Sequence, residues 1–348
     1  MTGTVDSQPR LTSKKTTDIQ PAVRELMYRE ALNEALFEEM RKDSGVFVMG
    51  EGIAERGGSY KVTAGLLEEF GPKRVLDTPI AEASFTGVGV GAAIAGLRPV
   101  VEILFVDFTM LAMDILINQA AKYKFMTGGT RNVPFVLRTQ GGVGNGVAAQ
   151  HSQSLEGIFY HVPGLKVVMP ATPYDAKGLL KSAIRCDDPV MFIEHKLLYM
   201  TKGQVPQEEY LVKLGKADIK RPGKDVTMIA WSNMVPRSLS AAGKLAEEGI
   251  DVEVVDLRTL VPLDKELILD SARKTGRVVV VQEAVRRGGV ASDVASIIQY
   301  EAFDYLDAPV EIVAGMNTPI PFNLNLERMC VPTEDDIISA AKRACYVS

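Results

Sequence analysis

Residues 77–93 read Asp77-Thr-Pro-Ile-Ala-Glu82-Ala-Ser-Phe-Thr-Gly87-Val-Gly89-Val-Gly91-Ala-Ala93. A predicted strand ends at the start of this stretch, a proline-containing loop follows, and Glu82 opens a helix rich in glycine and alanine. A carboxylate at a helix N-terminus is stabilised by the helix dipole, so Glu82 has a plain structural explanation beside a functional one. Glycine inside a helix lowers its stability, so Gly87, Gly91 and Gly96 indicate close approach of another helix or subunit.

Short apolar runs on both sides of this stretch alternate with helical patterns. Continuous apolar runs are typical of parallel strands that are covered on both faces of the sheet. We expect such strands at residues 46–49, 74–77, 100–106, 133–137, 165–169 and 190–193. We expect helices at residues 26–40, 110–126 and 173–185, the last with Thr172 as its N-cap.

A polar, lysine-rich stretch at residues 200–224 is followed by a second alternation. Its predicted strands are 226–231, 252–257, 278–281 and 310–313, and its predicted helices are 238–248, 263–274, 290–300 and 334–344. Strand–helix alternation in both halves predicts an α/β fold with two open, mostly parallel sheets. The predicted organisation is a flexible tail (1–24), an N-terminal domain (25–205), a linker (206–224) and a C-terminal domain (225–348).

The composition excludes several classes of protein. The net charge is −5 with lysine and arginine interspersed among acids, which is not the charge pattern of a nucleic-acid-binding protein. No apolar run is long enough to span a bilayer, so no membrane partner is expected. The three cysteines lack a metal-binding spacing, and the tail is polar and contains Asp6 and Asp18. Together these features predict reduced thiols and a cytoplasmic location.

The glycines of residues 87–92 also match the dinucleotide-binding pattern, with Asp107 after the next strand as a ribose-binding acid. In that pattern the first glycine makes the tight turn between strand and helix. Here a loop and Glu82 separate the strand from Gly87. The glycines are therefore expected inside the helix, which argues against a nicotinamide site.

A second glycine-rich segment, residues 138–146, follows the predicted strand 133–137 and precedes His151. The carboxyl ends of parallel strands are where ligands bind in such folds. The segment has two interpretations: a surface loop with a hydrogen-bonded histidine, or a loop that brings a proton-transferring histidine to a substrate. His161 and His195 are expected to be structural, and three histidines without metal-ligand spacing do not predict a zinc site.

The chain carries a set of motifs in a fixed order. They are Gly50-Glu-Gly52, Asp77-Thr-Pro-Ile-Ala-Glu82, Gly96-Leu-Arg-Pro99, Ala149-Gln-His-Ser-Gln153, Pro173-Tyr-Asp-Ala-Lys-Gly-Leu-Leu180, Glu283 and Thr318-Pro-Ile-Pro-Phe322. As a set they resemble the beta subunits of the thiamine-diphosphate-dependent first components of pyruvate, branched-chain 2-oxoacid and acetoin dehydrogenase complexes. The resemblance covers nearly the whole chain beyond the tail, and it implies a pyrimidine-binding domain followed by a transketolase-type C-terminal domain.

The resemblance also implies roles for individual residues. It makes Glu82 the carboxylate that hydrogen-bonds N1′ of the cofactor's aminopyrimidine, with Glu51 nearby in a proton network. It implies that Ile80 and Leu104 line the pyrimidine pocket and that Phe108 stacks on the ring. It makes His151 the histidine near the substrate, assisting decarboxylation or acyl transfer. It implies a monovalent-cation (K⁺) site, which here falls on Phe135, Ala183, Ile184, Cys186 and Asp188; Cys186 replaces the aspartate of the family pattern.

The family holds the cofactor's diphosphate through Mg²⁺ bound by a Gly-Asp-Gly motif, and this sequence contains no Gly-Asp-Gly. Acidic groups alone cannot neutralise a diphosphate, so the resemblance implies that a partner alpha subunit brings the Mg²⁺. It therefore implies an α2β2 heterotetramer with thiamine diphosphate shared between alpha and beta subunits. A dihydrolipoyl acyltransferase is the further expected partner, docking on the C-terminal domain.

The substrate stays open between pyruvate, acetoin and branched-chain oxoacids. Glu194-His-Lys-Leu-Leu-Tyr199 and Gln119-Ala-Ala-Lys122 look closer to acetoin dehydrogenases, whereas the short loop Gly52-Ile-Ala-Glu-Arg-Gly-Gly58 does not. Two alternatives from other classes remain: a split transketolase-like enzyme acting on sugars, and a non-catalytic scaffold or NAD-binding subunit. The neighbouring genes distinguish the first alternative, and replacement of Glu82 distinguishes the second.

Overall fold

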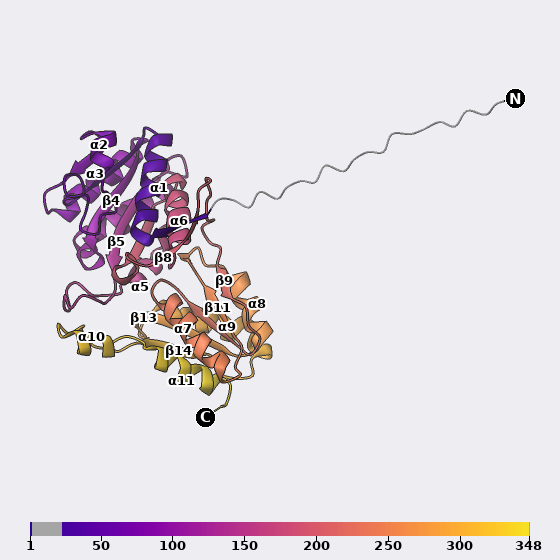
Figure 1. The fold of residues 1–348 in the computed structure, drawn as a ribbon. Helices are drawn as coiled ribbons and strands as arrows, with labels where there is room; N and C mark the ends of the chain where they lie inside the picture. The colour runs from indigo at the N-terminus through magenta and orange to yellow at the C-terminus, as the bar shows by residue number, and fades with distance from the viewer. Residues whose placement is uncertain (2–22, 348) are drawn as a thin grey trace.

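The computed structural model describes Met1 and residues 23–347 (Figure 1). Most of the predicted tail therefore lies outside the described residues. Its last two residues, Val23 and Arg24, belong to strand β1 (Val23–Met27). This strand pairs antiparallel with β8 (Lys202–Pro206), so the two ends of the first domain are joined in a small sheet of their own.

The first large sheet has the strand order β12-β6-β7-β5-β4-β2-β3. Its parallel members are β2 (Val46–Gly50), β3 (Val75–Asp77), β4 (Arg98–Phe105), β5 (Val136–Gly141), β6 (Lys166–Val168) and β7 (Val190–His195). The central strands β5 and β7 are buried along their whole length. Burial on both faces explains why these strands are continuous apolar runs rather than alternating ones.

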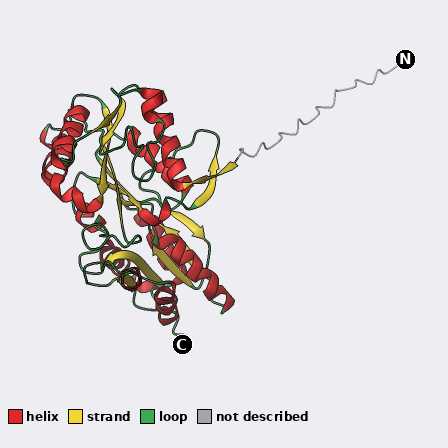
Figure 2. Cartoon of the chain, turned by 60° about the vertical axis from the view of Figure 1, so that its left-hand side comes forward, coloured by secondary structure: helices red, strands yellow, loops and turns green. Residues whose placement is uncertain are grey.

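Helices cover both faces of this sheet (Figure 2). Val100 of β4 belongs to the core with α1 (Tyr28–Lys42) and α6 (Pro173–Arg185), whereas Val101 belongs to the core with α3 (Glu82–Ile94). Successive residues of a strand point to opposite faces, so these pairs lie on opposite sides of the sheet. The first domain also contains α2 (Leu66–Phe70), α5 (Glu156–Tyr160) and the short turn η3 (Lys196–Leu198).

The helix predicted at residues 110–126 is not one uniform α-helix. It consists of a 3₁₀ segment η1 (Val106–Ala112), a π segment η2 (Asp114–Ala120) and α4 (Ala121–Met126). Apolar residues recur at similar spacings in 3₁₀, α- and π-helices, so hydrophobic periodicity does not distinguish the three kinds of helix. The segment ends at Met126, as predicted, and is followed by Gly128 and Gly129, which have positive φ values of 63° and 80°.

The second large sheet has the order β14-β13-β10-β11-β9. Its strands are β9 (Asp218–Arg221), β10 (Val226–Ala230), β11 (Val252–Asp256), β13 (Val278–Val285) and β14 (Glu311–Gly315), all parallel except β9. Its helices are α7 (Met234–Glu247), α8 (Lys265–Thr275), α9 (Val290–Glu301), α10 (Leu324–Met329) and α11 (Glu334–Ala344), with the short turn η4 (Phe303–Tyr305). The predicted α/β fold with two mostly parallel sheets is confirmed.

The segment predicted as a linker contributes to both domains. Strand β8 ends at Pro206, and β9 lies at the edge of the second sheet. Edge strands tolerate polar residues because one side of the strand faces solvent, and this made the segment look like a linker. In addition, β12 (Thr259–Val261) extends from the second half to pair antiparallel with β6 of the first sheet. Within the described residues no helix is long and apolar enough to cross a membrane.

Candidate active site

The carboxyl edge of the first sheet gathers the acidic residues that the sequence singled out. Glu51 follows the last residue of β2, and Glu82 is the first residue of α3, directly after the four-residue loop 78–81 that follows β3. The strands β3 and β4 lie on either side of β2. Chain connections therefore diverge at β2, and an open α/β sheet binds its ligands at such a point.

Glu82 is only 5% exposed, yet its carboxylate makes no hydrogen bond or ion pair with any other side chain among residues 23–347. Ile80, two residues earlier, is 82% exposed. Neither Glu82 oxygen is among the fully buried atoms without a partner, so the carboxylate still reaches solvent and is open to a donor from another molecule. The neighbouring apolar side chain offers a surface on which a flat ring could pack.

Glu51 belongs to the same group of carboxylates. Burial raises its pKa, and the nearby carboxylates of Glu82 and Glu102 raise it further. One carboxylate oxygen of Glu51, Oε1, is buried without a hydrogen-bond partner in the described part of the chain. The structure therefore brings Glu51 and Glu82 together, in a place where one shared proton is favoured.

An ion network lies in the sheet beneath this group. The Arg138 guanidinium binds Glu194 through Nε and Nη2, at 2.6 and 2.7 Å, and Glu102 through Nη1 at 2.6 Å. The hydroxyl of Tyr199 donates to Glu194 Oε2 at 2.6 Å. Sequence patterns do not predict this network, because a buried arginine within an apolar strand gives no periodic signal.

His151 and Phe108 are neighbours. The imidazole ring meets the edges of Phe105 and Phe108, with centroid distances of 5.1 and 5.2 Å and interplanar angles of 80° and 88°. His151 is half-buried, as are Phe108 and Leu104 near the end of β4. The structure thus places the predicted substrate histidine against the predicted ring-stacking phenylalanine, although the two are 43 positions apart in the chain.

Lys196 is a further polar residue of this region. Its ammonium group donates to the backbone oxygen of His151 and lies 5.5 Å from the centroid of the Phe105 ring. Burial lowers the pKa of Lys196, against the opposing influence of Asp107 and two glutamates. The signal that could have found it was its place directly after β7, at the carboxyl edge of the sheet.

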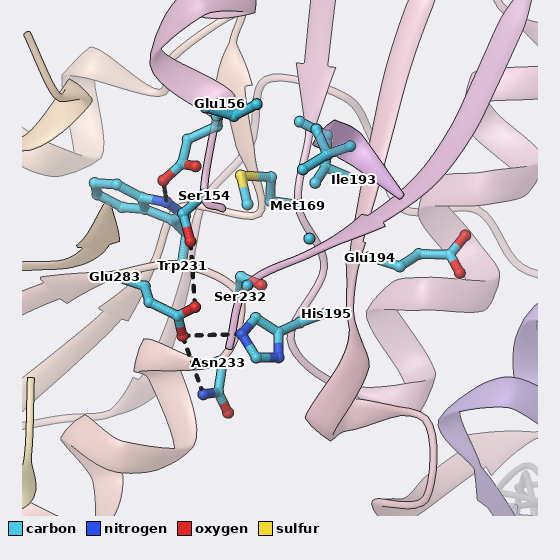
Figure 3. A pocket seen from close by; sticks show the side chains of 14 residues that line it. Ser154, Glu156, Met169, Ile193, Glu194, His195, Trp231, Ser232, Asn233 and Glu283 are labelled. Carbon is cyan, nitrogen blue, oxygen red and sulfur yellow. Dashed lines mark hydrogen bonds and ion pairs between the residues drawn. The ribbon is translucent and has the colours of Figure 1, made fainter. Parts of the chain in front are cut away.

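His195 has the structural role expected from the sequence. Its Nδ1 accepts from the backbone N–H of Leu197 at 3.1 Å, which leaves the proton on Nε2 to donate to Glu283 Oε2 at 2.9 Å. Glu283 stands on β13 of the second sheet, and Figure 3 shows it directed toward Ser154, His195 and Asn233. The carboxyl edges of the two sheets therefore face one another across this contact.

All five residues expected to bind a monovalent cation already have partners within the chain. Arg98 Nη1 donates to the backbone oxygens of Ile184 and Cys186, at 3.0 and 3.2 Å. The carboxylate of Asp188 binds Lys124 and Lys166 at 2.7 and 2.6 Å. The backbone oxygens of Phe135 and Ala183 accept from backbone N–H groups. This arrangement does not favour K⁺, and the cation site stays a prediction.

The dinucleotide interpretation does not fit the structure. Gly87, Gly89 and Gly91 lie within α3, several residues beyond its first turn. Close packing is found at Gly89, which was not among the glycines predicted to need it: a Cβ there would stand 2.6 Å from Val101 Cγ2 and 3.0 Å from Phe135 Cε2. Of the predicted positions, Gly87 has only an ordinary contact with Ile115, and Gly91 and Gly96 have no atom within 4 Å of such a Cβ in the described chain. Gly89 thus lets α3 approach the sheet, and the glycines do not form a phosphate-binding turn.

Comparisons with known proteins agree with this architecture. Residues 24–202 match the transketolase pyrimidine-binding domain, and residues 215–337 match the transketolase C-terminal domain. The chain is 50% identical over 324 residues to the pyruvate dehydrogenase E1 component subunit beta of Rickettsia felis, covering 93% of this chain and 99% of the relative. It is 50% identical over 329 residues to the mitochondrial subunit beta-1 of Arabidopsis thaliana, covering 93% and 91%.

Among solved structures, the fold is similar to a split-gene transketolase described as an inactive beta4 tetramer. The TM-score is 0.77 at 25% identity, with 92% of this chain and 99% of that chain covered. Two transketolase domains in this order, together with the two relatives at 50% identity, agree with the motifs from which the resemblance was drawn. The chain belongs to the family of pyruvate dehydrogenase E1 component beta subunits.

Proposed function

We propose that this chain is the beta subunit of a thiamine-diphosphate-dependent dehydrogenase that decarboxylates a 2-oxoacid of the pyruvate type. The observation that carries the proposal is the Glu82 side chain, which is 5% exposed, has no side-chain partner within residues 23–347 and lies beside Glu51 at the carboxyl edge of the sheet. A carboxylate without a partner in the protein can accept a hydrogen bond from a bound ring or share a proton with it.

The residues present fit the pyrimidine half of the cofactor. Glu82 would hold a proton at N1′ of the aminopyrimidine, which favours the imino form of that ring. Ile80 and Leu104 would contact the ring, and Phe108 would stack near it and exclude water. When bound, thiamine diphosphate would supply the nucleophilic carbon and the electron sink for decarboxylation.

Glu51 would keep the proton of this site within the protein. Its raised pKa means that it gives up a proton less readily than an exposed glutamate. The nearby carboxylates of Glu82 and Glu102 favour retention of a proton at Glu51, because a shared proton avoids adjacent negative charges.

His151 would act on the substrate side of the ring. Its imidazole is held between Phe105 and Phe108, and its backbone oxygen by Lys196. A fixed histidine at this position can donate a proton during decarboxylation or during transfer of the acyl group to a lipoyl acceptor. Transfer to a dihydrolipoyl acyltransferase is part of the proposal.

The diphosphate half of the site would come from an alpha subunit. The sequence contains no Gly-Asp-Gly, and a diphosphate needs a metal ion or basic groups to neutralise it. We therefore assign Mg²⁺ to the alpha subunit and the assembly to an α2β2 heterotetramer. Relatives named as subunits of a pyruvate dehydrogenase component support a multisubunit enzyme, as well as pyruvate as the substrate.

One specific observation favours a second candidate, a transketolase-like activity on sugars. It is the similarity to the split-gene transketolase, at 25% identity. The relatives named pyruvate dehydrogenase are twice as similar in sequence, at 50% identity. The dehydrogenase is therefore the first candidate.

The test is to co-express the chain with the alpha subunit of its complex and to measure dye reduction with several substrates. Pyruvate, acetoin, a branched-chain oxoacid and a ketose phosphate would be compared with thiamine diphosphate and Mg²⁺ present. The proposal expects turnover with pyruvate and none with the ketose phosphate. Turnover of the ketose phosphate with an aldose acceptor, and none with oxoacids, would establish the second candidate instead.

A further inference from the structure

The glycine-rich loop after β5 is bound by two carboxylates from the second half of the chain. Glu283 Oε1 accepts from the backbone N–H of Val143 at 2.8 Å. Glu327 of α10 accepts from the backbone N–H groups of Gly144 and Gly146, at 3.0 and 3.3 Å. Glu327 is 1% exposed, and Figure 1 shows α10 set apart from α11, toward the first domain.

Glycine is required at two positions of this loop, because a side chain there would collide with neighbouring residues. Gly142 has φ +81°, and a Cβ there would stand 2.1 Å from His195 Nε2 and 2.6 Å from Glu283 Oε1. Gly144 has φ +106°, and a Cβ there would stand 2.4 Å from Leu197 Cδ2. Positive φ and the absence of a side chain let the backbone N–H groups reach buried carboxylates.

The far end of the same segment returns to Glu283. The Ser154 hydroxyl donates to Glu283 Oε1 at 3.2 Å, and Gly142 N donates to the backbone oxygen of Gln153 at 2.9 Å. Glu283 therefore binds both ends of residues 142–154, and His151 lies between them. Burial opposes ionisation of Glu283, but His195 and the Val143 N–H outweigh it and lower its pKa to about 2, so the carboxylate is charged at neutral pH.

We infer that Glu283 and Glu327 are positioning residues for His151. They hold the loop that carries the histidine without touching the substrate themselves. Charge-assisted hydrogen bonds to backbone N–H groups are stronger than neutral ones, so two such carboxylates can fix a loop that glycine would otherwise leave flexible. The role of His151 in this inference rests on the proposed function.

The inference gives the C-terminal domain a part in the reaction. His151 belongs to the first domain, whereas Glu283 and Glu327 belong to β13 and α10 of the second. A shift between the domains would therefore move the histidine relative to Glu82. A displacement of about 1 Å at a catalytic group is enough to reduce the rate on the order of a hundredfold.

The test uses Glu327→Gln in the assembled complex with the alpha subunit. A glutamine oxygen can accept as before, but its amide nitrogen cannot accept from the second glycine N–H. We expect faster amide hydrogen exchange in residues 142–150 and a fall in kcat of about tenfold with KM nearly unchanged. The matched control is Glu248→Gln, which loses a surface pair with Lys342 at the C-terminal end of α7. It should change neither quantity.

A double-mutant cycle separates positioning from general destabilisation. Glu327→Gln should lower kcat in the natural chain but not in a His151→Ala background, because the loop then carries no group to position. An equal fall in both backgrounds, or unchanged exchange and kcat, would overturn the inference. Ser154→Ala, which removes one donor to Glu283, is the milder variant if Glu327→Gln fails to assemble, and it is judged by the same cycle. The exchange measurement needs no turnover, so it tests the loop contact even if the proposed function fails.

Discussion

Arg138 and Glu194 are joined by two parallel hydrogen bonds within the first sheet, Nε to Oε1 at 2.6 Å and Nη2 to Oε2 at 2.7 Å. Glu102 binds the remaining side of the guanidinium. The three residues stand on the neighbouring strands β5, β7 and β4. A buried arginine between two carboxylates lets acidic residues be placed under the active-site edge without leaving them unpaired.

Replacing Arg138 by Met should destabilise the chain strongly. It leaves Glu102 and Glu194 buried without their cation, and breaking a buried pair in this way costs about 3–5 kcal/mol. The expected result is a large fall in melting temperature or in soluble yield. Arg41→Met is the control, since it breaks the exposed pair with Glu69 and should change the melting temperature little. Equal effects of the two variants would show that the buried network is not needed.

Gly89 and Gly91 should respond oppositely to alanine. A Cβ at position 89 meets Val101 and Phe135, whereas one at position 91 meets nothing within 4 Å. Gly89→Ala should therefore lower stability by about 1–3 kcal/mol through overpacking. Gly91→Ala should be neutral or raise it by up to about 1 kcal/mol, because alanine favours a helix. Urea unfolding of the chain alone measures both, and a destabilising Gly91→Ala would contradict this packing of α3.

The pH dependence of activity should respond to Glu51. A like charge disfavours ionisation of its neighbours, so Glu51→Gln makes the remaining carboxyl group ionise more easily. The acidic limb of the activity profile of the complex should move to lower pH, by about one unit. Glu55→Gln, an exposed change in the same loop, is the control and should leave the profile in place. An acidic limb that moves to higher pH in Glu51→Gln would exclude the shared-proton account.

Asp256 at the end of β11 should make stability fall as pH rises. Burial, and then the charge of Asp175, raise the pKa of Asp256 to about 7. The folded state then keeps a proton that the unfolded state releases near pH 4, so the free energy of unfolding decreases between about pH 4 and pH 7. Asp256→Asn removes this dependence. Its melting temperature should exceed that of the natural chain more at pH 8 than at pH 5, and a constant difference would contradict the raised pKa.

Sequence patterns over a few neighbouring residues predicted the buried strands and the start of helix α6. The apolar runs gave parallel strands because both faces of the sheet are covered. Thr172 is the N-cap that the sequence indicated, with its hydroxyl accepting from Asp175 N at 3.2 Å. The short strand β12 was missed, since three residues carry no period and its partner β6 lies in the other half of the chain.

The candidate site was predicted residue by residue, but its contacts were not. Glu82 at the start of α3 could be read from the strand–loop–helix pattern. The contact between Glu327 and Gly144 joins residues 183 positions apart, and the Arg138–Glu194 pair joins residues 56 positions apart. Periodicity reports which face of an element is buried and contains no information about such partners. The Glu327–Gly144 contact forms only when the two halves of the chain pack together, and the Arg138–Glu194 pair only when β5 and β7 pair within the first sheet.

The most direct measurement is the turnover of the alpha–beta complex carrying Glu82→Gln. Glutamine keeps the size of the side chain but cannot hold the proton at the ring nitrogen. The account predicts a loss of oxoacid-dependent dye reduction of about a thousandfold or more, with assembly and melting temperature unchanged. Full activity in a complex that contains only the Glu82→Gln chain would contradict it.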